Sequence, residues 1–382
     1  MRERIAVIGT GTMGSQALWQ LSRTVCDITG YEIHSPGHAH GAAGGETRLF
    51  RTLELEEPRY LPLVERADEL WRSLEASSGR SLRDVTGALI IGDVSCSAIH
   101  TALGALDDRD SRYRVRTRQE TRQVFPEFAL DDNDITIWDE RGGIIKPELS
   151  VHTAAGLAEA NGARIIRDAR VRAIEQTDSG RVSVRTESDE KHYDRVIIAA
   201  GAWTSQLLPD LSSLFAMRRL VNIWFFGKGP GDLESILPYI RAEPAYSYGL
   251  PVPDRTMMKI GLGFRNHLPV DSPDNAPLRV DREDLAPFVR HLRRYIPVVD
   301  EHPVRVGVYF ESYTKNRREF VQEHPAMDNV LVMAGFSGHG FKMSPAMGEV
   351  AANWATGQQQ CVDMTFLRRT TSNLPHAETT EA

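Results

Sequence analysis

The sequence has 382 residues, enough for two domains, and its 25% charged and 41% hydrophobic residues are typical of a globular protein. A formal net charge of −7 argues against nucleic acid or an anionic membrane surface as a partner. Its three isolated cysteines favour a reducing cytoplasm over a disulfide framework, and with no long apolar run and a strand beginning at once we expect neither a membrane span nor a signal peptide.

The first segment predicts a loop that binds a dinucleotide. An apolar strand at 5–8 leads into Gly9, Gly11 and Gly14, spaced Gly-x-Gly-x-x-Gly, and a helical pattern follows. Gly9 allows a tight turn, Gly11 lets the backbone approach a pyrophosphate, and Gly14 packs the helix on the strand. NAD, NADP and FAD all fit such a loop, and Met13 is typical of nicotinamide enzymes.

The second predicted strand, within 27–34, narrows the choice among NAD, NADP and FAD. Glu32 falls at its end, eighteen residues after Gly14. A carboxylate at this spacing accepts the ribose hydroxyls of an adenosine and repels the 2′-phosphate of NADP. NAD and FAD remain.

The later elements favour FAD. A Gly-rich loop leads to a predicted helix at 58–77, and strands are predicted only much later, at 164–166, 171–176, 182–186 and 196–200. A third strand, Gly-rich turn and helix fill 329–357. An NAD dehydrogenase would complete its nucleotide domain in one run, whereas these pieces are separated by two other segments.

Six motifs in order carry a family resemblance: GTGTMG (9–14), GETRLFR (45–51), AAGAWTSQLL (199–208), YGLPVPDRTMMKIG (248–261), SYTK (312–315) and AGFSGHGFKMS (334–344). The chain resembles the monomeric sarcosine oxidase and N-methyltryptophan oxidase family, within the D-amino-acid-oxidase-like flavoproteins, from Arg4 to about Gly357.

The resemblance implies an α/β (α+β two-domain) fold. An FAD-binding Rossmann-type domain of glutathione-reductase type would comprise 1–85, 147–216 and 318–370. An antiparallel-sheet substrate domain, interleaved with it, would comprise 86–146 and 217–317, and 371–382 would form a disordered tail.

The resemblance also implies functional roles for several residues. Without it, the arginines would be interpreted as surface residues, the lysine as a sheet-edge residue and the tyrosines as core residues. Arg48 would lie against the flavin, Arg51 and Lys342 would bind a substrate carboxylate, and Lys259 would stand beside flavin N5 and help oxygen accept electrons. Tyr248 and Tyr313 would line the substrate pocket, with Tyr313 counted, like Arg48 and Lys259, as catalytic. The predicted cofactor-binding residues are Gly9, Gly11, Thr12, Met13, Gly14, Glu32, Arg48, Val171, Gly201, Trp203, Gly335, Ser337, Gly338, Gly340 and Lys342.

Some positions depart from the family. Glu311 stands where many members have the cysteine that links FAD, and Gly44 where a histidine often assists, so we expect noncovalent FAD. Gly263 replaces a histidine of the sarcosine oxidases, which predicts a less polar pocket with room for a larger substrate. His34, His38 and His40 lack nearby acids or thiolates, and we expect no metal.

These observations predict an FAD-dependent oxidase of a secondary amine or an amino or imino acid, giving an imine and hydrogen peroxide. Its partners would be the small amine and molecular oxygen, without nucleic acid or membrane, and we expect a cytoplasmic monomer. Two alternatives stay open: an FAD-dependent dehydrogenase or desaturase of a modified amino acid in a biosynthetic pathway, and, less favoured by the split nucleotide domain, an NAD-linked dehydrogenase.

Overall fold

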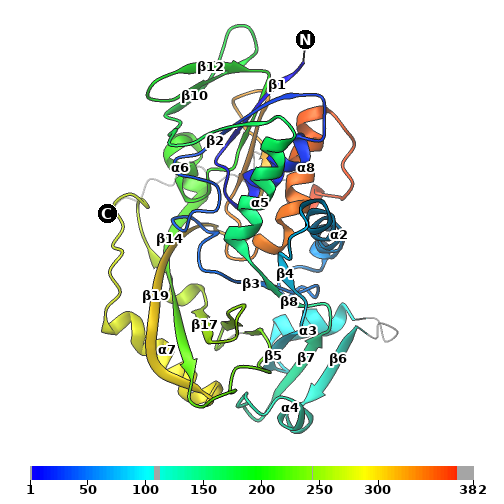
Figure 1. Ribbon diagram of the computed structural model, residues 1–382, viewed down its shortest axis with the longest axis vertical. Coiled ribbons are helices and arrows are strands. Elements are labelled where there is room, and N and C mark those ends of the chain that lie inside the picture. Colours follow the sequence, from blue (N-terminus) through cyan, green and yellow to red (C-terminus); the bar gives the residue numbers. More distant parts are fainter. Residues whose placement is uncertain (1, 107–111, 243, 368–382) are drawn as a thin grey trace.

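The computed structural model describes residues 2–106, 112–242 and 244–367, and the expected tail at 371–382 lies outside them. Figure 1 shows a sheet covered by helices toward one end of the molecule and a second, strongly curved sheet toward the other. Within the described residues no helix is both long and apolar enough to cross a membrane.

The first sheet has the strand order β20-β21-β13-β1-β2-β9. Its neighbouring strands run parallel, except that β20 is antiparallel to β21. Strands from three distant parts of the sequence thus form one sheet, as the expected split nucleotide domain requires. The members are β1 (Arg4–Ile8), β2 (Asp27–Tyr31), β9 (Arg164–Ile166), β13 (Arg195–Ile198), β20 (Phe320–Glu323) and β21 (Val330–Ala334).

Helices cover one face of this sheet (Figure 1). They are α1 (Thr12–Leu21), α5 (Pro147–Ala160) and α8 (Ser344–Thr356), and α2 (Leu61–Ser78) packs against α8. Helix α1 packs against both α5 and α8, and a Cβ at Gly348 would lie 2.5 Å from the backbone of Gln16, so this glycine permits the close approach of α8. Val7, Leu18 and Ala351 are fully buried between sheet and helices. This packing fixes the N-terminus of α1 at the carboxyl end of β1.

The other face packs on a small antiparallel sheet, which consists of β10 (Ala173–Gln176), β11 (Val182–Arg185) and β12 (Glu190–Tyr193). Ile8, Val184 and Val196 form part of the core between the two sheets. Strand β10 begins at Ala173, two residues later than the predicted strand at 171–176, so Val171 lies in a loop.

The second large sheet has the order β18-β14-β17-β16-β15-β5-β7-β6, with β19 paired to β14. Its pairs are antiparallel except β15 and β5, which are parallel. The expectation of an antiparallel sheet is therefore wrong at this pair, where two chain segments far apart in sequence meet and the sheet becomes mixed. The members are β5 (Ala88–Asp93), β6 (Tyr113–Thr117), β7 (Asp134–Asp139), β14 (Phe215–Gly227), β15 (Tyr239–Arg241), β16 (Ser247–Pro251), β17 (Met257–Leu262), β18 (Leu268–Pro269) and β19 (Val299–Thr314).

Strand alternation gives this sheet two different faces. Along β14, Ile223 and Phe225 pack into a core with Phe288 and Leu292 of α7 (Arg282–Tyr295). Asn222, on the opposite face, lines a cavity. Two short helices, α3 (Ser97–Gly104) and α4 (Arg118–Val124), flank the β5–β7 end.

A fourth sheet, also three-stranded, joins chain segments of both predicted domains. It pairs β8 (Gly143–Ile145) with β3 (Arg48–Phe50) and β4 (Arg83–Asp84). The predicted domain boundary at residue 146 assigns β8 to the substrate domain, whereas its partners β3 and β4 belong to the predicted FAD-binding domain. The domain limits therefore stay a prediction. The expected helix at 58–77 is present as the 3-10 turn Pro58–Tyr60 followed by α2.

Candidate active site

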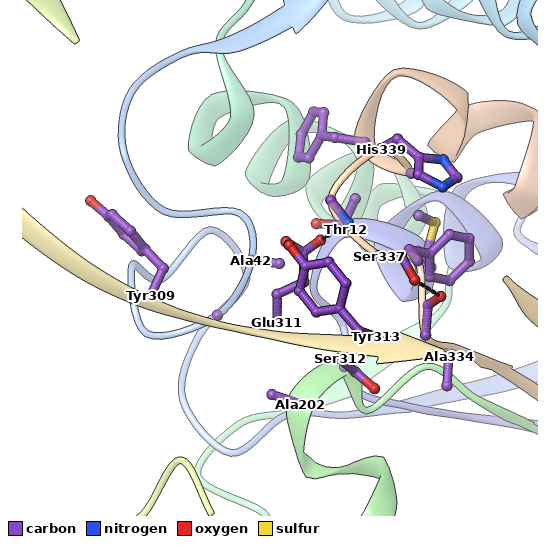
Figure 2. Close-up of a pocket in the computed structure, with 18 of the residues that line it drawn as sticks. Thr12, Ala42, Ala202, Tyr309, Glu311, Ser312, Tyr313, Ala334, Ser337 and His339 are labelled. Atoms are coloured by element: carbon purple, nitrogen blue, oxygen red, sulfur yellow. Dashed lines mark hydrogen bonds between the residues drawn. The ribbon is translucent and has the colours of Figure 1, made fainter. Parts of the chain in front are cut away.

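One cavity of about 720 Å³ extends between the first sheet and the second. Every residue predicted to bind cofactor or substrate or to take part in catalysis lines it, with the exceptions of Gly14 and Lys259. Figure 2 shows one part of the wall, where Thr12 of α1 lies across from Glu311 and Tyr313 of β19. The fold therefore brings together residues from all six motifs that carry the family resemblance.

The loop between β1 and α1 fits a pyrophosphate. Gly9 has φ +86°, and a Cβ there would lie 2.6 Å from the carbonyl oxygen of Ala199, so the turn requires glycine. A Cβ at Gly14 would lie 1.8 Å from the carbonyl oxygen of Gly9, whereas no described atom lies within 4 Å of a Cβ at Gly11. No side chain of the described residues caps α1, so its first N–H groups face the cavity and can bind an anion.

Glu32 lies at the end of β2, where an adenosine ribose would lie. Its Oε2 accepts hydrogen bonds from the Thr10 backbone N–H at 2.9 Å and hydroxyl at 3.0 Å, and its Oε1 accepts one from the His34 N–H. Burial acts to raise the pKa of Glu32, but His38 and the Thr10 N–H outweigh this and lower it to about 2. The carboxylate is charged and keeps lone pairs for hydroxyl donors.

The three histidines do gather beside Glu32. The rings of His34, His38 and His40 have centroids 4.6–5.7 Å apart, and His38 Nε2 lies 3.4 Å from Glu32 Oε1. Within the described parts of the chain, no cluster of three or more histidine, cysteine, aspartate or glutamate side chains has a geometry that could hold a metal ion. Of these histidines His38 lines the cavity, next to Glu32.

Arg48 is fixed by the loop before it. Its guanidinium donates to the carbonyl oxygens of Thr47 at 2.8 Å, Ala42 at 2.6 Å and Gly44 at 2.5 Å, and it lies 5.9 Å from the centre of the Phe341 ring. A Cβ at Gly44 would lie 2.6 Å from the carbonyl oxygen of Ala39, so a histidine does not fit there without a backbone shift. The loop that carries Arg48 is thus tightly packed.

Lys259 contacts the same loop from β17. Its Nζ donates to the carbonyl oxygen of Gly45 at 2.9 Å and to that of Thr47, and the side chain is fully buried. Burial and the nearby charge of Arg48 lower the pKa of Lys259 well below its usual value, against the opposing effect of Glu148 and Glu46. Lys259 therefore lies behind the loop rather than on the cavity wall.

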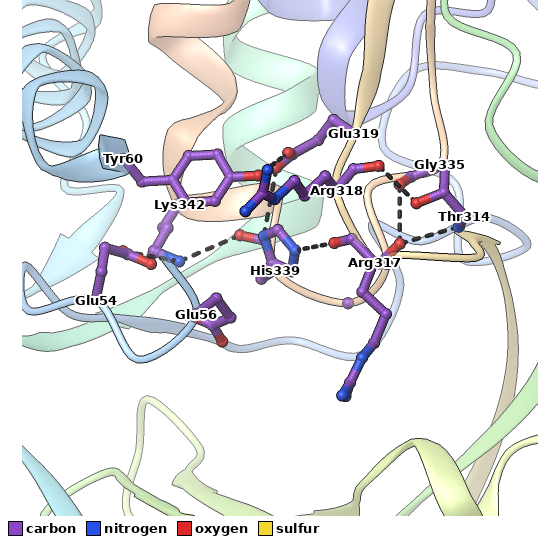
Figure 3. Close-up of polar contacts among 12 residues, drawn as sticks. Glu54, Glu56, Tyr60, Thr314, Arg317, Arg318, Glu319, Gly335, His339 and Lys342 are labelled. Carbon is purple, nitrogen blue, oxygen red and sulfur yellow. Dashed lines mark hydrogen bonds and ion pairs between the residues drawn. The ribbon is translucent and has the colours of Figure 1, made fainter. Parts of the chain in front are cut away.

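Four charged side chains form what we call the charged end of the cavity: Arg51, Glu54, Glu56 and Lys342. Arg51 donates from one nitrogen to both carboxylate oxygens of Glu56, at 2.9 and 2.6 Å. Lys342 Nζ lies 3.1 Å from Glu54 Oε1 (Figure 3). Although burial acts to raise the pKa of Glu56, Arg51 and Lys342 hold it well below its usual value. Sequence reasoning missed both acids, although the run ELEE at 54–57, shortly after β3, places three carboxylates close to Arg51 in the sequence.

Polar groups line the substrate side of the cavity. Tyr313 Oη lies 2.9 Å from His267 Nδ1 and donates to Glu311 at 3.4 Å, and Tyr248 Oη donates to Asn222 Oδ1 at 2.7 Å. Glu311 accepts a hydrogen bond from the Gly338 N–H at 2.8 Å, and burial raises its pKa.

The expectation that Gly263 leaves extra room is wrong. A Cβ at Gly263 would lie 2.5 Å from Cδ1 of Tyr246, so the Tyr246 ring fills that space. His267, four residues further along, supplies an imidazole to the same wall. Neither contact could be read from the sequence, because both depend on how the loop after β17 turns back.

A buried hydrogen-bonded group lies next to the charged end. Tyr60 donates its hydroxyl proton to Glu319, and His339 Nδ1 lies 3.3 Å from Glu319 Oε1 (Figure 3). His339 Nε2 lies 2.9 Å from the carbonyl oxygen of Arg317, and its own carbonyl accepts a hydrogen bond from Lys342 at 3.3 Å. These contacts fix the turn of GFSGHGFK, whose glycines line the cavity.

The sequence profile of the family described as DAO, FAD dependent oxidoreductase, matches residues 4–354. The chain belongs to this family. The monomeric sarcosine oxidase of Streptomyces avermitilis is 30% identical over 357 residues, which is 92% of this chain and 93% of the relative. The N-methyl-L-tryptophan oxidase of Salmonella arizonae is 26% identical, over 96% of this chain and 98% of the relative.

Solved structures agree on the fold. NikD, whose structure is described as that of an unusual amino acid oxidase essential for nikkomycin biosynthesis, matches with a TM-score of 0.83 at 22% identity, over 98% of this chain and 99% of that chain. The resemblance and the two-domain FAD-binding fold expected from the sequence are thus confirmed.

Proposed function

We propose that the protein is an FAD-dependent oxidase of a secondary amine or of an amino or imino acid, giving an imine and hydrogen peroxide. The observation that supports this is a single cavity that runs from the pyrophosphate-sized loop at Gly9 and Gly11 to a polar pocket under Tyr248 and Tyr313. Bound FAD supplies a two-electron acceptor that oxygen can reoxidise. The two curated relatives are both named as oxidases of N-methylated amines, which agrees with this reaction.

The chain's own residues would bind and orient the substrate. Arg51 offers a guanidinium fork to a carboxylate once Glu56 moves aside, with Lys342 at the same end of the cavity. The amine then faces Tyr248, Tyr313 and His267. Burial and Arg218 lower the pKa of His267 to about 4, so its ring is neutral at neutral pH and adds no positive charge beside the amine. Fixed orientation of this kind lowers the barrier by several kcal/mol, and by about 7–11 kcal/mol in the best-oriented cases.

The proposal also covers flavin attachment, location and oligomeric state. Glu311 in place of a thiol supports noncovalent FAD, and the chain is proposed to act as a cytoplasmic monomer.

The experiment is a visible spectrum of the purified protein, followed by oxygen uptake and peroxide measurements with N-methyl amino acids, cyclic imino acids and primary amino acids. We expect a flavin spectrum, bleaching by one of these amines under nitrogen, and stoichiometric peroxide in air. A protein without flavin, or one that no amine reduces, would contradict the proposal.

A dehydrogenase is the second candidate, and one observation favours it. Lys259, the residue expected to help oxygen react, is bonded to the carbonyls of Gly45 and Thr47 and does not line the cavity. Flavin that amines reduce rapidly, but that oxygen reoxidises no faster than free flavin, would identify this alternative.

A further inference from the structure

The two acids at the charged end of the cavity differ in their surroundings. Glu56 lines the cavity, with a side chain 28% exposed, and is held by two hydrogen bonds from Arg51. Glu54 does not line it and is 1% exposed. A carboxylate that enters the cavity can therefore replace Glu56, but it cannot reach the position of Glu54.

Glu54 lies between the two buried cations, and burial raises the pKa of its carboxyl against the opposing effect of Lys342 and Arg51. Among the described residues neither of its carboxylate oxygens accepts a hydrogen bond. Its Oε1 lies 3.1 Å from Lys342 Nζ and its Oε2 lies 3.6 Å from Arg51 NH1. A buried carboxylate without hydrogen bonds is costly, and it is tolerated only next to cations that are themselves buried.

Lys342 is held in place around this contact. Its Nζ also donates to the carbonyl oxygen of His339 at 3.3 Å, and its own carbonyl accepts a hydrogen bond from Trp71 Nε1 at 2.9 Å. Lys342 is 4% exposed, so it has little freedom to leave Glu54 for another partner.

We propose that Glu54 is a specificity-determining residue: as the buried counter-ion of Lys342, it leaves Arg51 as the uncompensated member of the two cations at the charged end, and so matches this end of the cavity to substrates with a single carboxylate. The proposal rests on the proposed function, because it takes this end of the cavity as the site for the substrate's acid. With Glu56 displaced, the two cations and Glu54 leave one positive charge, which a single carboxylate balances. Without Glu54 two positive charges would remain, and a dicarboxylate would be favoured.

The test is carboxylate binding to the flavin-loaded protein, measured by the change in the flavin visible spectrum and independently by calorimetry. The probes are acetate and malonate. We expect Glu54→Gln to bind acetate about tenfold more tightly than the parent, a change of about 1.4 kcal/mol, and to gain more for malonate. Glu69→Gln, which removes an exposed acid of α2 paired with Arg66, should change neither affinity.

A double variant separates charge from structure. If Glu54 acts through Lys342, the gain should disappear when Glu54→Gln is combined with Lys342→Met. Glu54→Met is a second single variant, because methionine has a similar length and no charge, and it should gain acetate affinity as Glu54→Gln does. A flavin-loaded Glu54→Gln protein that binds acetate no more tightly than the parent would overturn the proposal.

The outcomes also separate this inference from the proposed function. Neither probe needs turnover, so a gain in acetate affinity in a protein that oxidises no amine would refute the oxidase and leave the role of Glu54 standing. Amine oxidation with unchanged acetate affinity in Glu54→Gln would refute only the role of Glu54.

Discussion

Lys259 Nζ donates a hydrogen bond to the carbonyl oxygen of Gly45 at 2.9 Å, although 214 residues separate them in the sequence. The contact ties β17 of the second sheet to the loop that leads into β3, and Glu148 of α5 accepts the Gly45 N–H from the other side at 2.6 Å. The loop carrying Arg48 is thus held between a buried cation and a carboxylate.

Replacing Lys259 tests whether this buried charge serves the reaction with oxygen. Lys259→Met keeps the length of the side chain and removes its charge. If the ammonium stabilises the superoxide charge that forms first, reoxidation should slow about a hundredfold, or roughly 3 kcal/mol, by analogy with loss of an oxyanion-hole donor. Stopped-flow measurement of both half-reactions should show anaerobic reduction changing far less.

The exposed Lys228 provides the control for this experiment, and Lys228→Met should match the parent in both half-reactions. Equal reoxidation rates in Lys259→Met and the parent would leave Lys259 with a structural role in holding the Gly45 loop.

The pH dependence of reoxidation follows from the lowered pKa of Lys259. The charged form exists below that pKa, so reoxidation should be fast at low pH and should slow as pH rises through it. Because burial lowers the pKa, the decline should come at a lower pH than for an ordinary lysine. The Lys259→Met rate should not vary over the same range, and a parallel decline in the variant would assign the titration to another group.

The nucleotide side of the protein could be predicted because its signals are local. The spacing of Gly9, Gly11 and Gly14 reports steric needs within one turn, and Glu32 follows at a fixed distance along β2. The partners at the charged end are different. Glu54 and Lys342 are 288 residues apart, and the two chain segments meet where α2 packs against α8 and against the turn Phe341–Met343. Likewise the contact of His267 with Tyr313 depends on an irregular turn, which has no periodic pattern to read.

Arg51 should be the main anchor of a substrate carboxylate. Loss of one partner of a buried, charge-assisted pair costs about 2–5 kcal/mol, so Arg51→Ala should weaken acetate binding by roughly thirtyfold or more. Arg51→Lys should recover only part of this, because an ammonium cannot form the two-pronged contact. Arg72→Ala, an exposed arginine of α2, is the matched control. Unchanged acetate affinity in Arg51→Ala would move the acid-binding site elsewhere.

FAD should leave the protein on denaturation. Glu311 presents a carboxylate that accepts the Gly338 N–H, and a histidine cannot fit at Gly44 without a backbone shift, so neither group associated with covalent attachment is present there. Acid precipitation should release all yellow colour into the supernatant. Colour that remains in the washed pellet would require another nucleophile on the cavity wall.

Asp274 should help to retain FAD by joining the two parts of the molecule. It lies between β18 and α7 and accepts hydrogen bonds from Arg170 at 3.0 and 3.1 Å and from Trp203 Nε1 at 3.0 Å. Arg170 and Trp203 both line the cavity, on the side of the first sheet. The hydrogen bond from Arg170 is the main reason that the pKa of Asp274 falls to about 2.

Asp274→Asn should therefore raise the dissociation constant of FAD. Because the Asp274 side chain is 39% exposed, solvent screening reduces the expected loss to about 1 kcal/mol, or roughly fivefold. The measurement is fluorescence titration of deflavinated protein with FAD. Asp254→Asn is the control, because the described hydrogen bonds of this carboxylate go only to Thr256 in the same turn, and it should bind FAD like the parent.

Asp274 should also make folding stability depend on pH. Because its carboxyl pKa is lower in the folded state than the unfolded value of about 3.9, the charged carboxylate stabilises the folded protein above that value, and this contribution is lost as pH falls toward 2. The difference in free energy of unfolding between Asp274→Asn and the parent should accordingly stay constant from about pH 5 to pH 8 and disappear in acid. A difference that varies within the neutral range would show that a group other than Asp274 is responsible.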